Sequence, residues 1–322
     1  MTTQPLLRIG CHLPAVADVQ QRLAALALYR GPIDGIYGGG TAAAVKTFQR
    51  REGIATDGQV GPQTWAKLFP AQELPANPLL QEPLAKRCLA MTAGFETGKG
   101  FPDCFAQVTG DFDGQGMSLG VLQWNFGQGS LQPLLSEALR AAPEALTEIF
   151  HEHLPVLEAM LAADREEQMA FARSLAGPRH GVVEPWLGMF KALCRLPAFQ
   201  DIQVRHAARL MDEARRLAKQ FGLGSERAVA LMFDMLTQNG GIGSVVAAQI
   251  RSDFAGVTES GEAGEVARMV IVAKRRAAAA KAEWAEDVRI RKLCIAQGRG
   301  RVHGIDYDLE AQYGLFARSA GA

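Results

Sequence analysis

The stretch ETGKGFPDCFAQVTGDFDGQGMSLGVLQWNFGQGS, residues 96–130, differs from the sequence on either side of it and determines which fold we expect for this 322-residue chain. The segment LAKRCLAMTAGFE, which ends at Glu96, spaces its apolar residues as a helix does, and Gly98 follows as a stop signal. Glu96 is therefore predicted to lie at a helix end. Asp111 and Asp113 follow in GDFDGQG, which predicts a turn, and SLGVLQW then predicts a short strand or buried segment.

A Glu on a helix end opposed by an Asp in a polar loop suits a glycosidase. One carboxyl is kept protonated to donate to the leaving oxygen, and the other is ionised to activate water or attack the sugar. A calcium loop is the alternative for GDFDGQG, but the twelfth position counted from Asp111 is Leu122, where an EF-hand requires Glu. We therefore expect no metal here, and Asp111 and Asp113 both remain candidates for the second carboxyl.

With these residues in view, the segment resembles the catalytic core of the lysozyme superfamily, and most closely that of chitosanase-type inverting glycoside hydrolases. Their core pairs a helix-terminal Glu with an Asp in a GDGxGxTxG loop, and here Asp113 lies 17 residues after Glu96. The resemblance implies that Glu96 is the general acid and Asp113 the general base. It also places Ser118 where the family has a hydroxyl residue that helps to hold the attacking water.

The likeness extends over roughly residues 82–305. RAVALMFDMLTQNGG resembles the family's buried helix with an Asp, which is Asp234 here, and VAKRRAA and VRIRKLCIAQG resemble its two arginine segments. The resemblance implies an ion-pair network of Asp234, Arg275 and Arg291 behind the acids. The sequence departs from the family in its second loop acid, Asp111, and in LQWN, and these departures leave the substrate and the identity of the base open.

The residues just past the loop could bind sugar. Amide groups bond N-acetyl and hydroxyl groups, so we expect Asn125 and Gln128 to contact substrate, with Asp111 beside them. Trp124 has two interpretations: it stacks on a sugar ring, or it packs in the core because it lies in an apolar run.

Composition places the chain among ordinary globular proteins, with 48% hydrophobic and 21% charged residues. Basic and acidic residues number 34 each, so we expect neither nucleic acid nor a membrane as partner. Met1–Gly10 is too polar for a signal peptide, and we expect synthesis in the cytoplasm. The five cysteines have no metal spacing and are interpreted as packing residues, and we expect no cofactor.

Residues 10–70 contain an internal repeat. Asp34-Gly35-Ile36-Tyr37-Gly38 recurs as Asp57-Gly58-Gln59-Val60-Gly61, and a Thr follows seven residues after each Asp, at Thr41 and Thr64. Each unit therefore predicts a DG turn and a helix that the Thr hydroxyl caps. VQQRL, DGIYGGGT, AVKTFQ and DGQVGPQTW together resemble the peptidoglycan-binding domain of cell-wall hydrolases. The expected core consists of Val19, Leu23, Leu26, Val45, Phe48, Trp65 and Leu68.

The expected architecture is mainly α: a three-helix peptidoglycan-binding bundle (1–70), a Pro-rich linker (71–83) with few contacts across it, and an α-rich lysozyme-like domain (84–322) with a small β element at its site. The expected function is muramidase-type cleavage of peptidoglycan. Chitosanase activity and an inactive wall-binding protein are the alternatives. Such a protein is expected to act on the wall in the periplasm or outside the producing cell. Without a signal peptide, it would reach the wall either as a phage endolysin or as a secreted antibacterial effector. An effector would have an immunity protein or a secretion component as partner.

Overall fold

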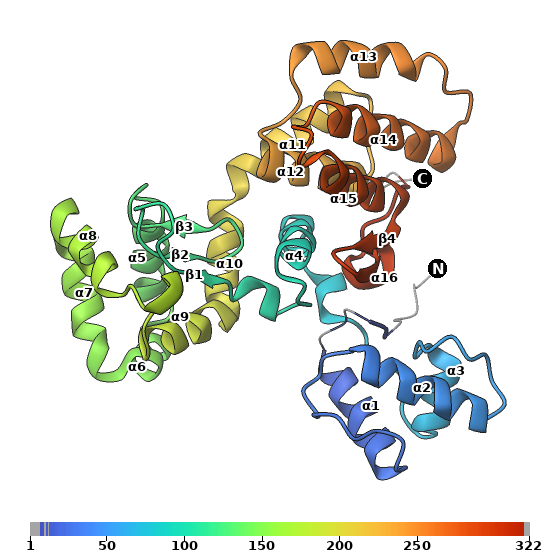
Figure 1. Cartoon of the computed structure of the whole chain (residues 1–322), viewed down its shortest axis with the longest axis horizontal. Helices are drawn as coiled ribbons and strands as arrows, with labels where there is room; N and C mark the ends of the chain where they lie inside the picture. The colour runs from blue at the N-terminus through green and yellow to red at the C-terminus, as the bar shows by residue number, and fades with distance from the viewer. Residues whose placement is uncertain (1–6, 10, 12, 319–322) are drawn as a thin grey trace. The chain divides into compact units, whose positions relative to one another are not determined.

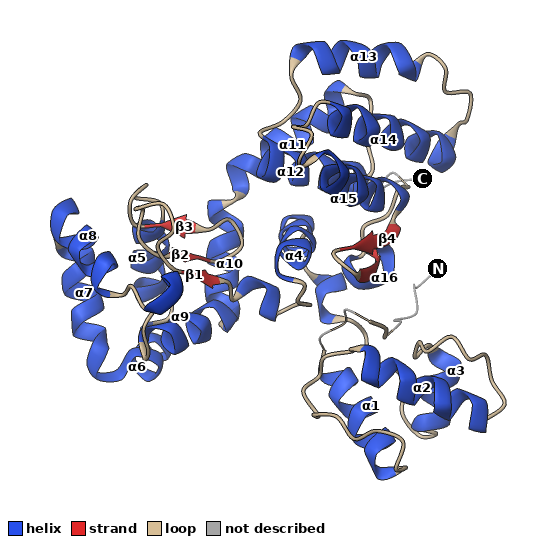
Figure 2. Cartoon of the chain, viewed as in Figure 1, coloured by secondary structure: helices blue, strands red, loops and turns tan. Residues whose placement is uncertain are grey.

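The computed structural model describes residues 7–9, 11 and 13–318, and these form two compact units. Unit 1 contains residues 1–101 and 210–322, and unit 2 contains residues 102–209. The first and last residues of the predicted domains, Met1 and Ala322, lie outside the described residues. So does most of Met1–Gly10, the segment that we judged too polar for a signal peptide. Helices dominate both units and strands are short, which confirms the predicted mainly α class (Figure 2).

The N-terminal part of unit 1 consists of α1 (Pro14–Ala25), α2 (Gly39–Arg51) and α3 (Pro62–Leu68) (Figure 1). Their apolar faces meet in one cluster, which confirms the predicted core, with Leu26 at its margin. Two buried glutamines explain the sequence repeat. The amide nitrogen of Gln20 donates to Asp34 Oδ1 (2.9 Å) and Thr41 Oγ1 (3.2 Å), and that of Gln49 donates to Asp57 Oδ1 (2.8 Å) and Thr64 Oγ1 (3.1 Å).

These bonds correct the predicted helix caps. Thr41 and Thr64 lie inside α2 and α3, whose N-cap residues are Gly38 and Gly61. Because each Thr side chain is buried, its hydroxyl accepts from a glutamine on another helix instead of from the start of its own helix.

The Pro-rich segment is more closely packed than a linker with few contacts. Its C-terminal half forms a 3-10 turn, η1 (Pro78–Gln81), and Leu79 is fully buried. The Asn77 side chain donates to the Gln312 carbonyl (2.9 Å), which lies in α16 (Leu309–Tyr313). Buried backbone groups need partners, and Asn77 supplies one for a helix end. The proposed domain boundaries themselves stay a prediction.

The rest of unit 1 contains α4 (Leu84–Thr97), which is buried along most of its length and contacts α12 (Glu226–Asn239) and α16. Its other elements are α11 (Ala208–Gln220), α13 (Ser244–Phe254), α14 (Gly261–Ala278), α15 (Ala285–Gln297) and the antiparallel hairpin β4 (Arg299–Val302) and β5 (Ile305–Asp308). Helix α12 begins at the cap Ser225, whose hydroxyl accepts from Ala228 N at 3.1 Å, and it ends at Gly240.

Unit 2 packs a small antiparallel sheet on helices. The sheet consists of β1 (Val108–Thr109), β2 (Ser118–Leu119) and β3 (Trp124–Asn125), in that order. The helical elements are η2 (Asp103–Phe105), α5 (Leu131–Ala141), α6 (Pro143–Phe150), η3 (His151–His153), α7 (Leu154–Ala162), α8 (Arg165–Ser174), η4 (Pro178–His180), α9 (Trp186–Arg195) and α10 (Pro197–His206).

One apolar run does not form the single helix that its pattern would suggest. The run LTEIFHEHLPVLEAMLAA is divided into α6, η3 and α7, because His151 leaves the helical region with a φ of 42°. All five cysteines are buried, in keeping with the packing role predicted for them. Across the part of the chain that the structure describes, no helix is long and apolar enough to cross a lipid bilayer.

Candidate active site

Glu96 lies in the last turn of α4, as predicted. The helix is buried up to Phe95 and ends at Gly98, whose φ of 68° is the left-handed conformation that closes many helices. The Glu96 side chain is 43% exposed. A buried helix therefore presents one accessible carboxyl at its end.

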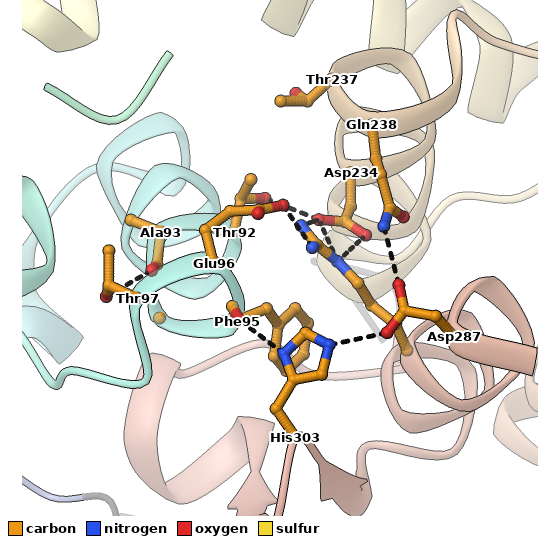
Figure 3. Close-up of polar contacts among 12 residues, drawn as sticks. Thr92, Ala93, Phe95, Glu96, Thr97, Asp234, Thr237, Gln238, Asp287 and His303 are labelled. Atoms are coloured by element: carbon orange, nitrogen blue, oxygen red, sulfur yellow. Dashed lines mark hydrogen bonds and ion pairs between the residues drawn. The ribbon is translucent and has the colours of Figure 1, made fainter. Parts of the chain in front are cut away.

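Behind Glu96 lies a buried cluster of charges from two other helices of unit 1 (Figure 3). Asp234 of α12 is fully buried and accepts from Arg291 Nη2 (2.6 Å) and from Lys292 Nζ (2.5 Å), both on α15. The Thr92 hydroxyl of α4 donates to the same carboxylate at 3.0 Å. Arg291 Nη1 also donates to Glu96 Oε1. Arg291 thus links the buried aspartate to the exposed glutamate.

The electrostatics of this cluster favour a cation facing Glu96. Burial by itself would raise the pKa of Asp234, but Arg291 and Lys292 outweigh it and hold that pKa well below its ordinary range. Burial lowers the pKa of Lys292 to about 8, so its ammonium is still charged at neutral pH. Two cations therefore surround one buried anion, and Glu96 accepts a hydrogen bond from one of them.

Arg275 is a correction to the predicted network. Its guanidinium binds Asp253 through Nε (2.5 Å) and Nη2 (2.8 Å), and its side chain is 39% exposed. Lys292 instead is the second cation at Asp234. The sequence holds one indication of this role for Lys292, which directly follows Arg291 in VRIRKLC. Only the tertiary structure shows that Lys292, and not Arg275, binds Asp234.

The loop acids belong to unit 2 and hold their own turn. Asp111 Oδ1 accepts from Gly114 N (2.7 Å), and Asp113 Oδ1 accepts from Gln115 N (3.1 Å). Asp113 is exposed, whereas Asp111 is half-buried and its carbonyl lies 2.9 Å from His180 Nδ1. The turn predicted from the glycines is therefore present, with Gly114 at a φ of 78°.

The other predicted site residues of unit 2 have different surroundings. Ser118 is half-buried in β2, opposite Asn125 in β3. Asn125 is a correction: it is 5% exposed, and its Oδ1 accepts from Gln128 N (2.8 Å), so it stabilises a turn instead of facing substrate. Gln128 is exposed and stays a candidate. Trp124 belongs to the core, which is the second of its two interpretations.

A second candidate surface lies on the N-terminal bundle. A groove of about 590 Å³ runs between the loop after α1 and helix α2, and its lining includes residues 27–32 and Gly40, Thr41, Ala43, Ala44 and Thr47. Tyr29 and the half-exposed Ile36 contribute apolar area there. Sequence reasoning did not find this groove, because it depends on how the loop folds back on α2.

Within the residues that have described positions, no group of three or more His, Cys, Asp or Glu side chains could hold a metal ion.

Comparison with known proteins identifies the N-terminal region. Residues 12–68 match the model of the putative peptidoglycan binding domain. An uncharacterized protein of Kitasatospora aureofaciens is 44% identical over 68 residues, which is 21% of this chain. The chain spans 58% of the length of that relative. The chain is thus similar to a modular peptidoglycan hydrolase in carrying a peptidoglycan-binding domain at its N-terminus.

Solved structures show more distant likeness. A chitosanase of Gynuella sunshinyii in complex with chitotetraose is 16% identical, with a TM-score of 0.42 over 73% of this chain and 98% of that one. A chitosanase of Bacillus subtilis in complex with six glucosamine units is 16% identical, with a TM-score of 0.41 over 68% of this chain and 87% of that one. An endolysin of Burkholderia phage AP3 is 20% identical, with a TM-score of 0.20 over 72% and 96%. Because these TM-scores are below 0.5, we infer function from the chain's own residues.

Proposed function

We propose that this chain is a peptidoglycan hydrolase of the muramidase type, which cleaves the glycan backbone of bacterial cell walls by inverting acid/base catalysis. The observation that carries the proposal is the environment of Glu96. An exposed carboxyl at the end of a buried helix accepts a hydrogen bond from Arg291, which is itself buried and paired with Asp234. Burying two cations and an anion is costly, and their placement behind an exposed glutamate supports a functional role for that carboxyl.

In the proposed chemistry each acid carries out one proton transfer. Glu96 gives its proton to the glycosidic oxygen as the bond to the anomeric carbon breaks, and Arg291 stabilises the carboxylate that remains. Asp113 takes a proton from the water that attacks the opposite face of the sugar ring, with Ser118 as a second group to hold that water. Inversion requires the two carboxyls about 6.5 to 9.5 Å apart, which leaves room for the water.

The match of residues 12–68 to a peptidoglycan binding domain supports the wall as substrate. A wall-binding module raises the effective concentration of a tethered enzyme on the polymer that it binds. We propose that the groove beside Tyr29 and Ile36 is the wall-binding surface, because it combines an accessible hollow with apolar side chains.

The direct test is digestion of purified peptidoglycan by the full chain. Products are reduced with borohydride and analysed by mass spectrometry, so that the reduced sugar identifies the bond. We expect reduced N-acetylmuramic acid, and Glu96→Gln should release none of it. Reduced N-acetylglucosamine would refute the muramidase assignment, and a chain that pellets with the wall but releases no sugar would indicate an inactive wall-binding protein.

Chitosanase activity is the second candidate, because the motif around Glu96 and Asp113 most closely resembles chitosanases. Chitosan and peptidoglycan are therefore offered to the same preparation at equal mass. We expect the rate of reducing-end release from peptidoglycan to exceed that from chitosan. A reversed preference would assign the chain to chitosan.

We further propose that the chain reaches the wall as a phage endolysin or as an injected effector. Expression in the cytoplasm of a Gram-negative host should then be tolerated, whereas the same chain directed to the periplasm by an added signal sequence should lyse the cells. Equal tolerance in both compartments would contradict this proposal.

A further inference from the structure

The turn of the β4–β5 hairpin places a histidine next to the helix end that carries Glu96. Val302 pairs with Ile305, so His303 and Gly304 form a two-residue turn, and both have positive φ values, 48° and 81°. This is the conformation of the primed hairpin turns, and histidine is among the residues that tolerate it. Figure 3 shows the His303 ring between Phe95 of α4 and Asp287 of α15.

Both partners of the ring are hydrogen-bond acceptors. His303 Nδ1 lies 3.0 Å from the Phe95 carbonyl oxygen, and Nε2 lies 2.6 Å from Asp287 Oδ1. A neutral imidazole carries one N–H group, and the imidazolium carries two. Only the doubly protonated ring therefore donates to both partners, and loss of one proton breaks one of the two bonds.

The same contacts connect His303 to the charge cluster by a second route. Asp287 Oδ2 accepts from Gln238 Nε2 (3.2 Å), and Gln238 Oε1 accepts from Lys292 Nζ (2.7 Å). Lys292 binds Asp234, which binds Arg291, and Arg291 donates to Glu96. A closed chain of hydrogen bonds thus starts at the Phe95 carbonyl and returns to the Glu96 carboxylate.

Helix α15 supplies one residue near each end of this chain of hydrogen bonds, Asp287 and Arg291. Asp287 and Arg291 are four residues apart and therefore lie on one face of the helix. Asp287 contacts the α4 backbone at Phe95 through His303. Arg291 binds the side chain of Glu96, the residue after Phe95, directly. Tyr307 of β5 adds a further contact, since its hydroxyl donates to the Gly94 carbonyl at 3.0 Å.

We propose that His303 is a positioning residue for Glu96: its doubly protonated ring holds the last turn of α4 through the Phe95 carbonyl, and its deprotonation releases that turn. This inference rests on the proposed function of Glu96 as the general acid. It predicts a loss of activity on the alkaline side that originates outside the reacting groups.

The charges around the ring determine the direction of this effect. The hydrogen bond to Asp287 raises the pKa of His303 above its ordinary value of 6.5, against the smaller opposing effects of burial and of Arg291. The packed elements also carry other charged side chains: Lys86, Arg87 and Glu96 on α4, Glu286, Arg289 and Lys292 on α15, and Arg299, Arg301, Asp306 and Asp308 on the hairpin. A raised pKa means that the stabilisation is fully present below pH 6.5 and is lost as pH rises through the folded-state pKa.

Lys292 could produce a similar alkaline loss, because its pKa is lowered to about 8. The variants must therefore separate the two groups. His303→Asn keeps a residue that favours the turn conformation but is too short for both bonds. Asp287→Asn keeps the shape of the partner and removes the charge that raises the His303 pKa. His151→Asn is the matched control, because His151 also has a positive φ, 42°, and is exposed in unit 2.

Activity is measured as kcat and KM across pH 5 to 9. At pH 6 we expect His303→Asn to lower kcat on the order of 10-fold by misplacing Glu96, with KM little changed. The alkaline limb due to His303 should disappear in this variant and move to lower pH in Asp287→Asn, while His151→Asn behaves as wild type. An unchanged kcat and alkaline limb in His303→Asn would assign the limb to another group, either Lys292 or the general acid Glu96 itself, and overturn the proposal.

A second readout needs no catalysis. The His303 ring and the Glu96 backbone amide are followed by NMR through the same pH range, and we expect both to titrate with one pKa above 6.5. The titration of the Glu96 amide should vanish in His303→Asn. A Glu96 amide whose titration is the same in wild type and in His303→Asn would overturn the inference. Coupled titration in a chain that cleaves no glycan would refute the proposed function and leave the coupling established.

Discussion

The two candidate acids are supported in different ways. Glu96 ends a buried helix and contacts Arg291, which is 1% exposed and bound to an aspartate without solvent contact. Asp113 lies on an exposed glycine-rich turn, and its described hydrogen bond is to Gln115 N, two residues away. Long-range contacts therefore determine the position of one acid, and local backbone geometry determines that of the other.

This difference has a physical basis. A general acid must be aimed at one oxygen, and a helix end fixed by buried charges provides that rigidity. A loop held by short-range bonds tolerates movement, which suits a base that acts through a water molecule. The comparison predicts that substitutions behind Glu96 affect stability and rate together, whereas substitutions in the loop affect the rate alone.

The largest effect is expected at Glu96 itself. Glu96→Gln keeps the shape and the contact with Arg291 but has no proton to give, so the rate should fall on the order of 10² to 10⁴ with little change in melting temperature. Glu283→Gln, at an exposed position, is the control and should have wild-type activity. A Glu96→Gln variant with more than a tenth of wild-type activity would remove Glu96 from the role.

Breaking the buried pair should cost the most stability. Arg291→Met leaves the Asp234 carboxylate buried with Lys292 alone, and we expect a loss of about 3 to 5 kcal/mol in the free energy of unfolding, measured in urea. The double variant with Asp234→Asn should recover part of this loss, because the uncompensated charge is gone. An additive double variant would show that the two side chains act independently.

Substitutions of the two loop acids should differ in their effect on the cleavage rate and not in their effect on stability. We expect Asp113→Asn to lower glycan cleavage by at least about 10² and Asp111→Asn to leave most of it, since only the base takes a proton from water. The urea midpoints of both should stay close to wild type. Inactive Asp111→Asn beside active Asp113→Asn would make Asp111 the base, and NMR detection of a retained anomer would exclude inversion.

The smallest effect is expected at Arg275, which the structure removes from the buried network. Its pair with Asp253 is exposed to solvent, where water and salt screen the attraction, so the pair contributes little to stability. Arg275→Ala should therefore leave the rate unchanged and shift the unfolding free energy only slightly. A strong loss of activity would restore the role that the sequence suggested for it.

Local features of the sequence determined much of this protein. The helix that ends at Glu96, the turn around Asp113 and the helices of the repeat follow from apolar spacing and from glycine, which act over a few residues. The predicted core of the N-terminal bundle is confirmed for the same reason. Sequence resemblance, not spacing, placed Asp234 and Arg291 behind Glu96.

Only the tertiary structure decided which residues meet across the chain. The resemblance suggested Arg275 as a further cation for Asp234, but packing of α15 on α12 places Lys292 there instead, and Arg275 pairs with Asp253. Asn125 carries the right groups for sugar binding, but burial commits it to a turn. His303 and Phe95 are far apart in sequence, and no periodicity links a hairpin turn to a helix end. Such contacts depend on the positions of whole elements, which a local pattern does not contain.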